Sequence, residues 1–386
     1  MGINDFLNMN RALEVIKSRV SLGNQRLEEV QERLSDAEQQ IRKQNRRIGE
    51  LEKTILKEFQ RRDQWEKRAA EIQYLAQGRP IWSIKCPAPD SELRYHGGKY
   101  GDYAYCLTIR RQLELMGYYA YVDCYEDWDC PVEADVVLVI RGVHEYHPDR
   151  RSTKTCYVLW MVSHPELITC EELERYDLVL VDSKSYAEKL QQQVSVPVRP
   201  FYVLTDTEMF YPSEKNNLTP KYNRVFIGNT RGVLRNCVRW CNDNQIEVDV
   251  WGAEWEKFYP DSMYVHLHGQ IEYHQISEVY RNSRFVINDH YPEMIETEMM
   301  NNRFPEVLLS GIPMVCDWTE SFERNYGDMV LFYRNEEEFV QCMKEMEERY
   351  DELKANVMKN QEKLQEEFDF RRGIERMKAL IDDISQ

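Results

Sequence analysis

Apolar side chains recur every seven residues along the first part of the chain. With position a of a heptad set at Leu13, all seven a positions as far as Ile55 are apolar, and so are four of the seven d positions. The a residues are Leu13, Val20, Leu27, Leu34, Ile41, Ile48 and Ile55, and the d residues are Ile16, Gly23, Val30, Ala37, Gln44, Leu51 and Glu58. A strict seven-residue repeat is typical of a left-handed coiled coil. The alternative is a single amphipathic helix that lies on the rest of the protein.

We therefore predict that residues 1–77 form a coiled coil through which the protein makes a homo-oligomer. The small and polar residues at several d positions leave open how many helices associate in the coiled coil.

The pattern changes after Pro80, where short runs rich in β-branched and aromatic residues alternate with helical stretches. Continuous apolar strands between helices are typical of a parallel sheet covered on both faces. In a first series, strands are expected at Ile81–Cys86, Tyr119–Asp123, Val136–Arg141, Cys156–Val162, Leu178–Asp182 and Val196–Val203, with helices at Tyr103–Met116 and Ser185–Gln193.

The alternation restarts after a polar connection. In this second series, strands are expected at Arg224–Ile227, Glu247–Trp251, Val265–His268, Phe285–Asn288, Pro313–Cys316 and Met329–Tyr333, with helices at Val233–Asn242, Gln275–Asn282 and Glu306–Ser310. The fold class is therefore α/β, with two Rossmann-like domains that face each other across a cleft. We expect the first domain at 78–205, a linker at 206–222, the second domain at 223–368 and a C-terminal helix at 369–386, which could return to the first domain.

The charge of the chain limits its partners. The 386 residues carry a net charge of −17, but residues 1–77 carry +2, so the remainder carries −19. A body this acidic disfavours nucleic acid and anionic lipid as partners. No apolar run approaches the ~18 residues that span a bilayer, and no signal-peptide pattern opens the chain, so we expect a cytoplasmic protein. Ten cysteines without a Cys-x-x-Cys pair favour free thiols over a zinc site.

Two loops carry candidate chemistry. In "NRVFIGNTRGVLRN" a strand ends at Gly228-Asn229-Thr230-Arg231-Gly232 and a helix is expected to follow, an arrangement that favours an anion such as a phosphate. In "ETEMMNNRFPEVLLSGIPMVCDW" we expect Pro305 at the first helical position and Glu306 in the first turn, with Glu298 upstream. A carboxylate held there could accept two hydrogen bonds from a ribose diol, or it could merely stabilise its own helix.

These motifs resemble those of glycosyltransferases with the GT-B fold. The E-x7-E spacing followed by "EVLLSGIPMV" is similar to their nucleotide-sugar site, and "FVINDHYPEM" with "NNRFPEVLLSGIPMVCD" resembles the CgeB-like branch, the spore maturation protein type. The same branch shows a Gly-Asp-Tyr loop, found here at Gly101-Asp102-Tyr103, and strands like "DVVLVIRG" and "WMVSHP". The resemblance covers about residues 80–386 and leaves the heptad segment out.

The resemblance implies a role for each matching residue. Glu306 would bind the ribose, Arg303 and Arg231 would lie near the diphosphate, and Gly228 with Asn229 would form the phosphate loop. Asn288, His290 and Asn302 would line the donor pocket. Pro305 stands where the family usually has an aromatic or aliphatic residue.

An inverting transferase also needs a base for the acceptor hydroxyl, whereas a retaining one does not. Asp102 is the first candidate, although it could simply cap the helix from Tyr103. His164 comes second, with a role in the core as its alternative, and His96 third. Asp127-Trp128-Asp129 looks like a metal-binding Asp-x-Asp, but it lacks a suitable preceding strand, and we assign it no metal.

The sequence thus predicts a metal-independent glycosyltransferase that needs no cofactor. It would move a sugar from a nucleotide-diphosphate sugar to a glycan or protein, as in polysaccharide or glycoconjugate synthesis. A coiled-coil scaffold with an inactive body and a nucleotide-sugar epimerase are the alternatives. The base, the sugar, the acceptor and the stereochemistry stay open.

Overall fold

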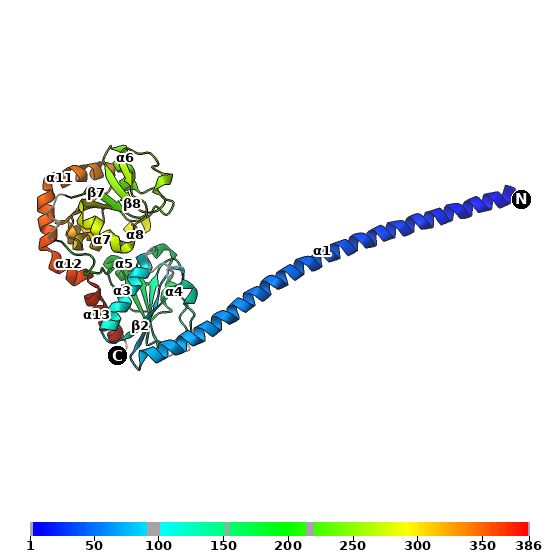
Figure 1. Cartoon of the computed structure of the whole chain (residues 1–386), viewed down its shortest axis with the longest axis horizontal. Helices are drawn as coiled ribbons and strands as arrows, with labels where there is room; N and C mark the ends of the chain where they lie inside the picture. The colour runs from blue at the N-terminus through cyan, green and yellow to red at the C-terminus, as the bar shows by residue number, and fades with distance from the viewer. Residues whose placement is uncertain (1–2, 91–100, 151–153, 214–219, 385–386) are drawn as a thin grey trace. The chain divides into compact units, whose positions relative to one another are not determined.

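The computed structural model describes residues 3–90, 101–150, 154–213 and 220–384. They form two compact units, one ending at Glu71 and the other beginning at Ile72. The first unit is part of a single helix, α1 (Ile3–Ala76), drawn in blue in Figure 1. The a residues of the heptad are exposed along α1, from 50% at Leu13 to 60% at Leu34. The helix is confirmed, and its association as a coiled coil stays a prediction.

The second unit contains two parallel six-stranded sheets. The first sheet has the strand order β2-β1-β3-β4-β5-β6. Its strands are β1 (Ile81–Lys85), β2 (Tyr119–Asp123), β3 (Val136–Arg141), β4 (Cys156–Met161), β5 (Leu178–Val181) and β6 (Val198–Pro200). Its helices are α3 (Gly101–Leu115), α4 (Cys170–Leu173) and α5 (Lys184–Gln191). We call this sheet with its helices the first lobe.

The second sheet has the order β12-β11-β10-β7-β8-β9. Its strands are β7 (Tyr222–Ile227), β8 (Val248–Trp251), β9 (Val265–Leu267), β10 (Ser283–Asn288), β11 (Met314–Asp317) and β12 (Val330–Tyr333). The helices around it are α6 (Asn236–Asp243), α7 (Tyr273–Arg281), α8 (Pro292–Glu296), α9 (Arg303–Leu309), α10 (Glu320–Tyr326), α11 (Glu336–Lys359) and α12 (Gln361–Phe368). This is the second lobe. The α/β class with two Rossmann-like sheets is confirmed.

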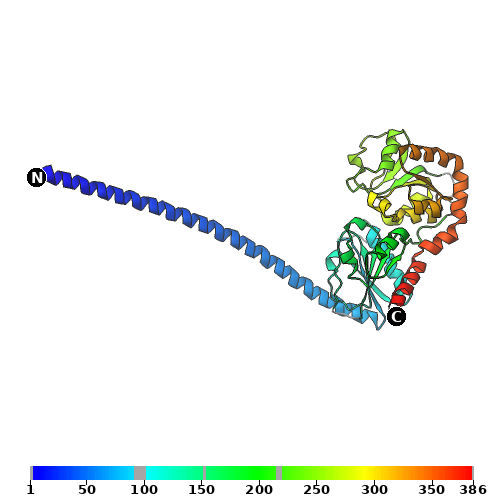
Figure 2. The same cartoon turned by 180° about the vertical axis from the view of Figure 1, so that it is seen from behind.

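The chain crosses back to the first lobe at its C-terminal end. Helix α13 (Phe370–Ile384) buries Ile374 and Met377 in the same core as Ile109 of α3. Figures 1 and 2 both show this red helix beside α3, while α11 and α12 run along the second lobe. The possible return of the last helix to the first half of the body is therefore confirmed.

Strand ends agree with the sequence better than helix starts. β2 and β3 occupy the expected residues, whereas β6 is shorter than Val196–Val203. The helix expected from Val233 begins only at Asn236. Apolar runs locate buried strands directly, but where a loop ends and a helix begins depends on contacts with the rest of the fold.

Candidate active site

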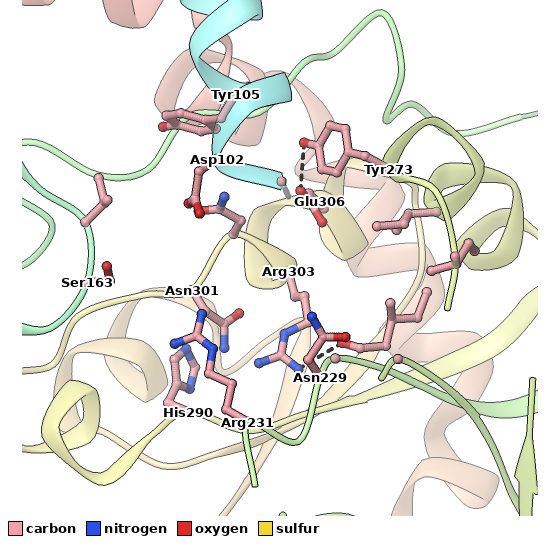
Figure 3. Close-up of a pocket in the computed structure, with 18 of the residues that line it drawn as sticks. Asp102, Tyr105, Ser163, Asn229, Arg231, Tyr273, His290, Asn301, Arg303 and Glu306 are labelled. Carbon is pink, nitrogen blue, oxygen red and sulfur yellow. Dashed lines mark hydrogen bonds between the residues drawn. The ribbon is translucent and has the colours of Figure 1, made fainter. Parts of the chain in front are cut away.

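A cavity of about 650 Å³ lies between the two lobes, at the carboxyl ends of their strands. This volume is typical of small-molecule sites. The first lobe contributes residues from the start of α3 and the ends of β3 and β4, among them Asp102, Tyr105 and Ser163. The second lobe contributes the segments that follow β7, β8 and β10, and α9. Figure 3 shows Asp102 and Tyr105 on one side of the space, and Arg231, Arg303 and Asn301 on the other.

Glu306 is a buried acid in the wall of this cavity. It lies on α9, is 3% exposed, and accepts a hydrogen bond from the Tyr273 hydroxyl at 3.0 Å (Figure 3). Burial raises the pKa of its carboxyl to about 8, against the opposing effects of the Tyr273 hydroxyl and the Arg303 cation. An ionisable group with a strongly shifted pKa in a cleft is a candidate for function.

The expected start of this helix was wrong. α9 begins at Arg303, with Asn302 at the N-cap, so Pro305 is the third residue of the helix and Glu306 the fourth. Pro305 is tolerated there because the amides of a first turn have no partner within the helix. Arg303 and Glu306 are three residues apart on α9, and both line the cavity.

Arg303 is fixed by backbone carbonyls. Its Nη1 donates to Ile227 O and its Nη2 to Asp289 O, both at 2.9 Å. A Cβ at Gly228 would lie 2.6 Å from Arg303 Nη1, so a larger residue at this position would displace the guanidinium from its present place. The Arg303 guanidinium therefore connects the start of α9 with the end of β7.

The loop after β7 is tied to the loop after β8. Asn229 Oδ1 accepts a hydrogen bond from Ala253 N at 2.8 Å, and a Cβ at Gly252 would lie 2.1 Å from Gly228 O. Arg231 has a left-handed backbone with φ of 49°. Because α6 begins only at Asn236, Gly228 and Asn229 precede the helix by more than a turn, and any anion there would meet the loop rather than a helix end.

Two arginines of this loop differ in their partners. Arg235 is buried in an ion pair with Asp289 and donates to its backbone carbonyl at 2.9 Å. Arg231 lies 5.2 Å from the ring of Tyr291 and 3.5 Å from His164 Nε2. Among the described residues, neither Arg231 nor Arg303 has a carboxylate within ion-pair distance. These two are the cations available to an anionic ligand.

His290 is held by an acid behind it. Its Nδ1 lies 2.6 Å from Asp317 Oδ1, and its backbone amide donates to Asp317 Oδ2 at 2.6 Å. Burial acts to raise the pKa of Asp317, but the charge and hydrogen bonds of His290 outweigh it and lower that pKa. His290 is among the residues that line the cavity, and its Nε2 is buried without a hydrogen-bond partner among the described residues. Asp317 thus fixes the orientation of the ring.

The expected place of Asn288 was wrong. It is fully buried outside the cavity lining, where its Oδ1 accepts from Asn301 Nδ2 at 3.1 Å. Asn301, which the sequence did not single out, lines the cavity beside Asn302, and its Oδ1 accepts from Phe304 N at 3.3 Å. Asn288 therefore positions a lining residue instead of being one.

Glu298, the other acid of the E-x7-E pair, also lies outside the lining. It accepts hydrogen bonds from Ser185 Oγ at 2.6 Å and from Ser321 N at 3.2 Å. Ser185 belongs to α5 of the first lobe, so Glu298 connects the lobes.

The candidate bases lie in different settings. Asp102 lines the cavity in the first turn of α3, opposite the arginines (Figure 3). His164 is not among the lining residues, and both its ring nitrogens have neighbours, Nδ1 with Glu166 at 3.0 Å and Nε2 with Arg231 at 3.5 Å. His96 lies outside the described residues. In the Asp127-Trp128-Asp129 segment, Trp128 is buried and donates to Cys86 O at 2.9 Å. In the described part of the chain, no helix has both the length and the apolar character to cross a membrane.

Comparisons with known proteins agree with this architecture. The family described as glycosyl transferase-like matches residues 231–379, which include Arg231, Arg303 and Glu306. No curated protein matches the sequence closely enough to be called a relative.

Solved structures resemble about four fifths of the chain. Sucrose-phosphate synthase from Thermosynechococcus elongatus superimposes with a TM-score of 0.62 at 11% identity, over 79% of this chain and 99% of that one. A glycosyltransferase from Rickettsia africae gives 0.57 at 8% identity, over 80% and 99%. Anabaena HepE in complex with UDP-glucose gives 0.53 at 12% identity, over 78% and 99%. At these identities the likeness shows a shared fold, which is GT-B. Residues 231–379 therefore match a glycosyl transferase-like family, and the chain has the GT-B fold.

Proposed function

We propose that this glycosyltransferase of the GT-B type transfers a sugar from a nucleotide-diphosphate sugar to a hydroxyl group of a glycan or protein. The observation that carries the proposal is a buried carboxylate, Glu306, in the wall of a cavity that also holds the cations Arg231 and Arg303. A sugar nucleotide presents a diol and a diphosphate in succession, and these side chains match the two groups. The likeness of the motifs around Asp102 and Asn302 to the CgeB-like branch also supports this proposal.

Glu306 is suited to the ribose. Its Oε1 accepts from Tyr273, and a carboxylate has further lone pairs for hydroxyl donors. Hydrogen bonds to a charged acceptor are worth roughly 1.5–3 kcal/mol each. The lining residues Gln270, Ile271 and Ile276 lie close to Tyr273 in the chain, so we propose that they contact the nucleobase.

The diphosphate would lie on the arginine side. Arg231 and Arg303 can donate charge-assisted hydrogen bonds, the Gly228 and Asn229 segment lets a phosphate approach the backbone, and His290 Nε2 is a further polar contact. As the sugar leaves, negative charge grows on the diphosphate, and fixed cations stabilise it. We therefore propose that transfer needs no metal ion.

Asp102 is the proposed base. It lines the cavity from the first lobe, opposite Arg231 and Arg303 (Figure 3). An acceptor hydroxyl would lie on this side, across from the sugar nucleotide. His164 fits this role less well, because it is not among the residues that line the cavity.

The test is a screen of UDP, GDP, dTDP, CMP and ADP sugars by thermal shift, followed by product analysis with and without acceptors. We expect one nucleotide class to raise Tm, and its donor to be consumed faster when an acceptor hydroxyl is supplied. A body without activity that serves only as a scaffold would show no shift. An epimerase would convert its donor without any acceptor.

A further inference from the structure

Helix α1 carries a stripe that is apolar at every a position and at four of the seven d positions. Between residues 13 and 58, the large apolar side chains at a and d are exposed by 50% to 62%. Only three exposed large apolar side chains in this range, Val15, Leu22 and Leu56, lie outside a and d. We propose that residues 13–58 associate with the same residues of another copy of this chain, as a parallel coiled coil in register.

The core positions favour the parallel direction. In a parallel pair, each a or d residue faces the same residue of the other copy, so Ile41 and Ile48 make apolar layers and Gln44 faces Gln44. Two glutamine amides can exchange hydrogen bonds, because each has a donor and an acceptor. In a fully overlapped antiparallel pair, Gln44 would instead face Leu27, which offers its side chain no partner.

The flanking positions favour the same direction. The g positions are basic at Arg19, Arg26, Arg33 and Arg47. In a parallel pair, a g residue meets the e residue five positions later in the other copy, so Arg33 meets Glu38 and Arg47 meets Glu52, while Arg19 and Arg26 meet Asn24 and Gln31.

An antiparallel pair would bring g positions together. With full overlap Arg26 then faces Arg47 of the other copy, and the two cations repel each other. The stripe therefore fits the in-register parallel pair better than the fully overlapped antiparallel pair. The two lobes follow α1 in the chain. In a parallel coiled coil, the lobes of all copies would therefore be attached at the same end. This inference is independent of the proposed function.

Cysteine cross-linking of the full chain tests direction and register together. The chain has no cysteine before Cys86, so a cysteine introduced in α1 is the sole thiol of that segment. In the parallel pair, A37C at d faces its own copy, while the matched control S35C, two residues away at b, lies on the outer face. The wild type is a second control, because any cross-link that it forms must come from the native cysteines, which begin at Cys86.

Under mild oxidation with a glutathione buffer, we expect A37C to form a disulfide-linked dimer at least tenfold faster than S35C or the wild type. Sedimentation equilibrium of the unmodified chain at micromolar concentration should give the mass of two or three copies. The I41E/I48E double variant should sediment as a monomer. Its circular dichroism should keep the helical signal of residues 78–386, which shows that this part of the chain still folds. A monomeric wild type, which would leave the stripe to another protein or surface, overturns the proposal. The proposal is also overturned if A37C forms cross-links no faster than S35C, which is the result expected of an antiparallel pair.

Discussion

The Asp182 carboxylate of the first lobe accepts a hydrogen bond from the backbone amide of Met300 in the second lobe, at 3.0 Å. Its other oxygen accepts from Val203 N at 3.0 Å, in the segment that connects the lobes. Asp182 is fully buried, and burial raises its pKa well above the usual range. Met300 directly precedes Asn301 and Asn302, so one acid connects the lobes next to the cavity wall.

Replacing Asp182 by Asn should therefore affect both stability and binding. The amide of Asn can satisfy only one of the two backbone N–H groups, and an unpaired buried donor costs about 1–3 kcal/mol. We expect D182N to lower the free energy of unfolding by that amount in urea titrations and to weaken nucleotide binding. D261N, at an exposed aspartate of the second lobe, is the control. Equal stability of the two variants would show that the contact does not hold the lobes.

The raised pKa of Glu306 predicts a pH dependence of binding. In the free protein its carboxyl, with a pKa of about 8, is mostly protonated at neutral pH. If the ribose diol binds the carboxylate, as proposed, binding should release a proton, and the affinity should rise up to tenfold per pH unit until about pH 8. Calorimetry in buffers of different ionisation enthalpy measures that proton. E306Q should remove both the proton release and the pH dependence.

The same shift affects stability with the opposite sign. A carboxyl whose folded pKa is raised from 4.5 to about 8 binds more protons in the folded state than in the unfolded one. Its contribution to stability is therefore full below pH 4.5 and is lost as the pH rises toward 8. E306Q should be less sensitive to pH than the wild type over that interval in urea titrations.

Asp102 should act in turnover rather than in donor binding. D102N keeps the size of the side chain but is not a base, so we expect kcat to fall roughly 10²–10⁴-fold, with nucleotide affinity nearly unchanged. Steady-state kinetics and calorimetry separate the two. Unchanged kcat would exclude Asp102 as the base and would fit a retaining route.

Asp317 should act through His290. Because it holds the Nδ1 side of the ring, D317N would free the imidazole and weaken diphosphate binding by roughly ten- to hundredfold, the range of one charge-assisted hydrogen bond. H290Q should have a similar effect, and the double variant should be little worse than either single variant. Additive losses would show that the two residues act separately.

The sequence predicted the sheets well, because parallel strands buried on both faces are continuous apolar runs. The resemblance to GT-B glycosyltransferases also pointed to Glu306 and Arg303, which both line the cavity. The partners of these residues escaped prediction. The Tyr273–Glu306 and His290–Asp317 contacts join residues 33 and 27 positions apart, and no local pattern encodes them. The contact of Glu298 with Ser185 of the other lobe is likewise beyond any local pattern.

The most direct test of the sugar-nucleotide site is calorimetric titration of wild type, E306A and the control E296A with the nucleotide found by the screen. Glu296 is an exposed acid of the same lobe, ten residues before Glu306. We expect E296A to bind like the wild type and E306A to lose two ribose hydrogen bonds, which weakens binding by roughly a hundredfold or more. If E306A binds the nucleotide as tightly as the wild type, Glu306 does not hold the ribose, and the proposed donor site is wrong.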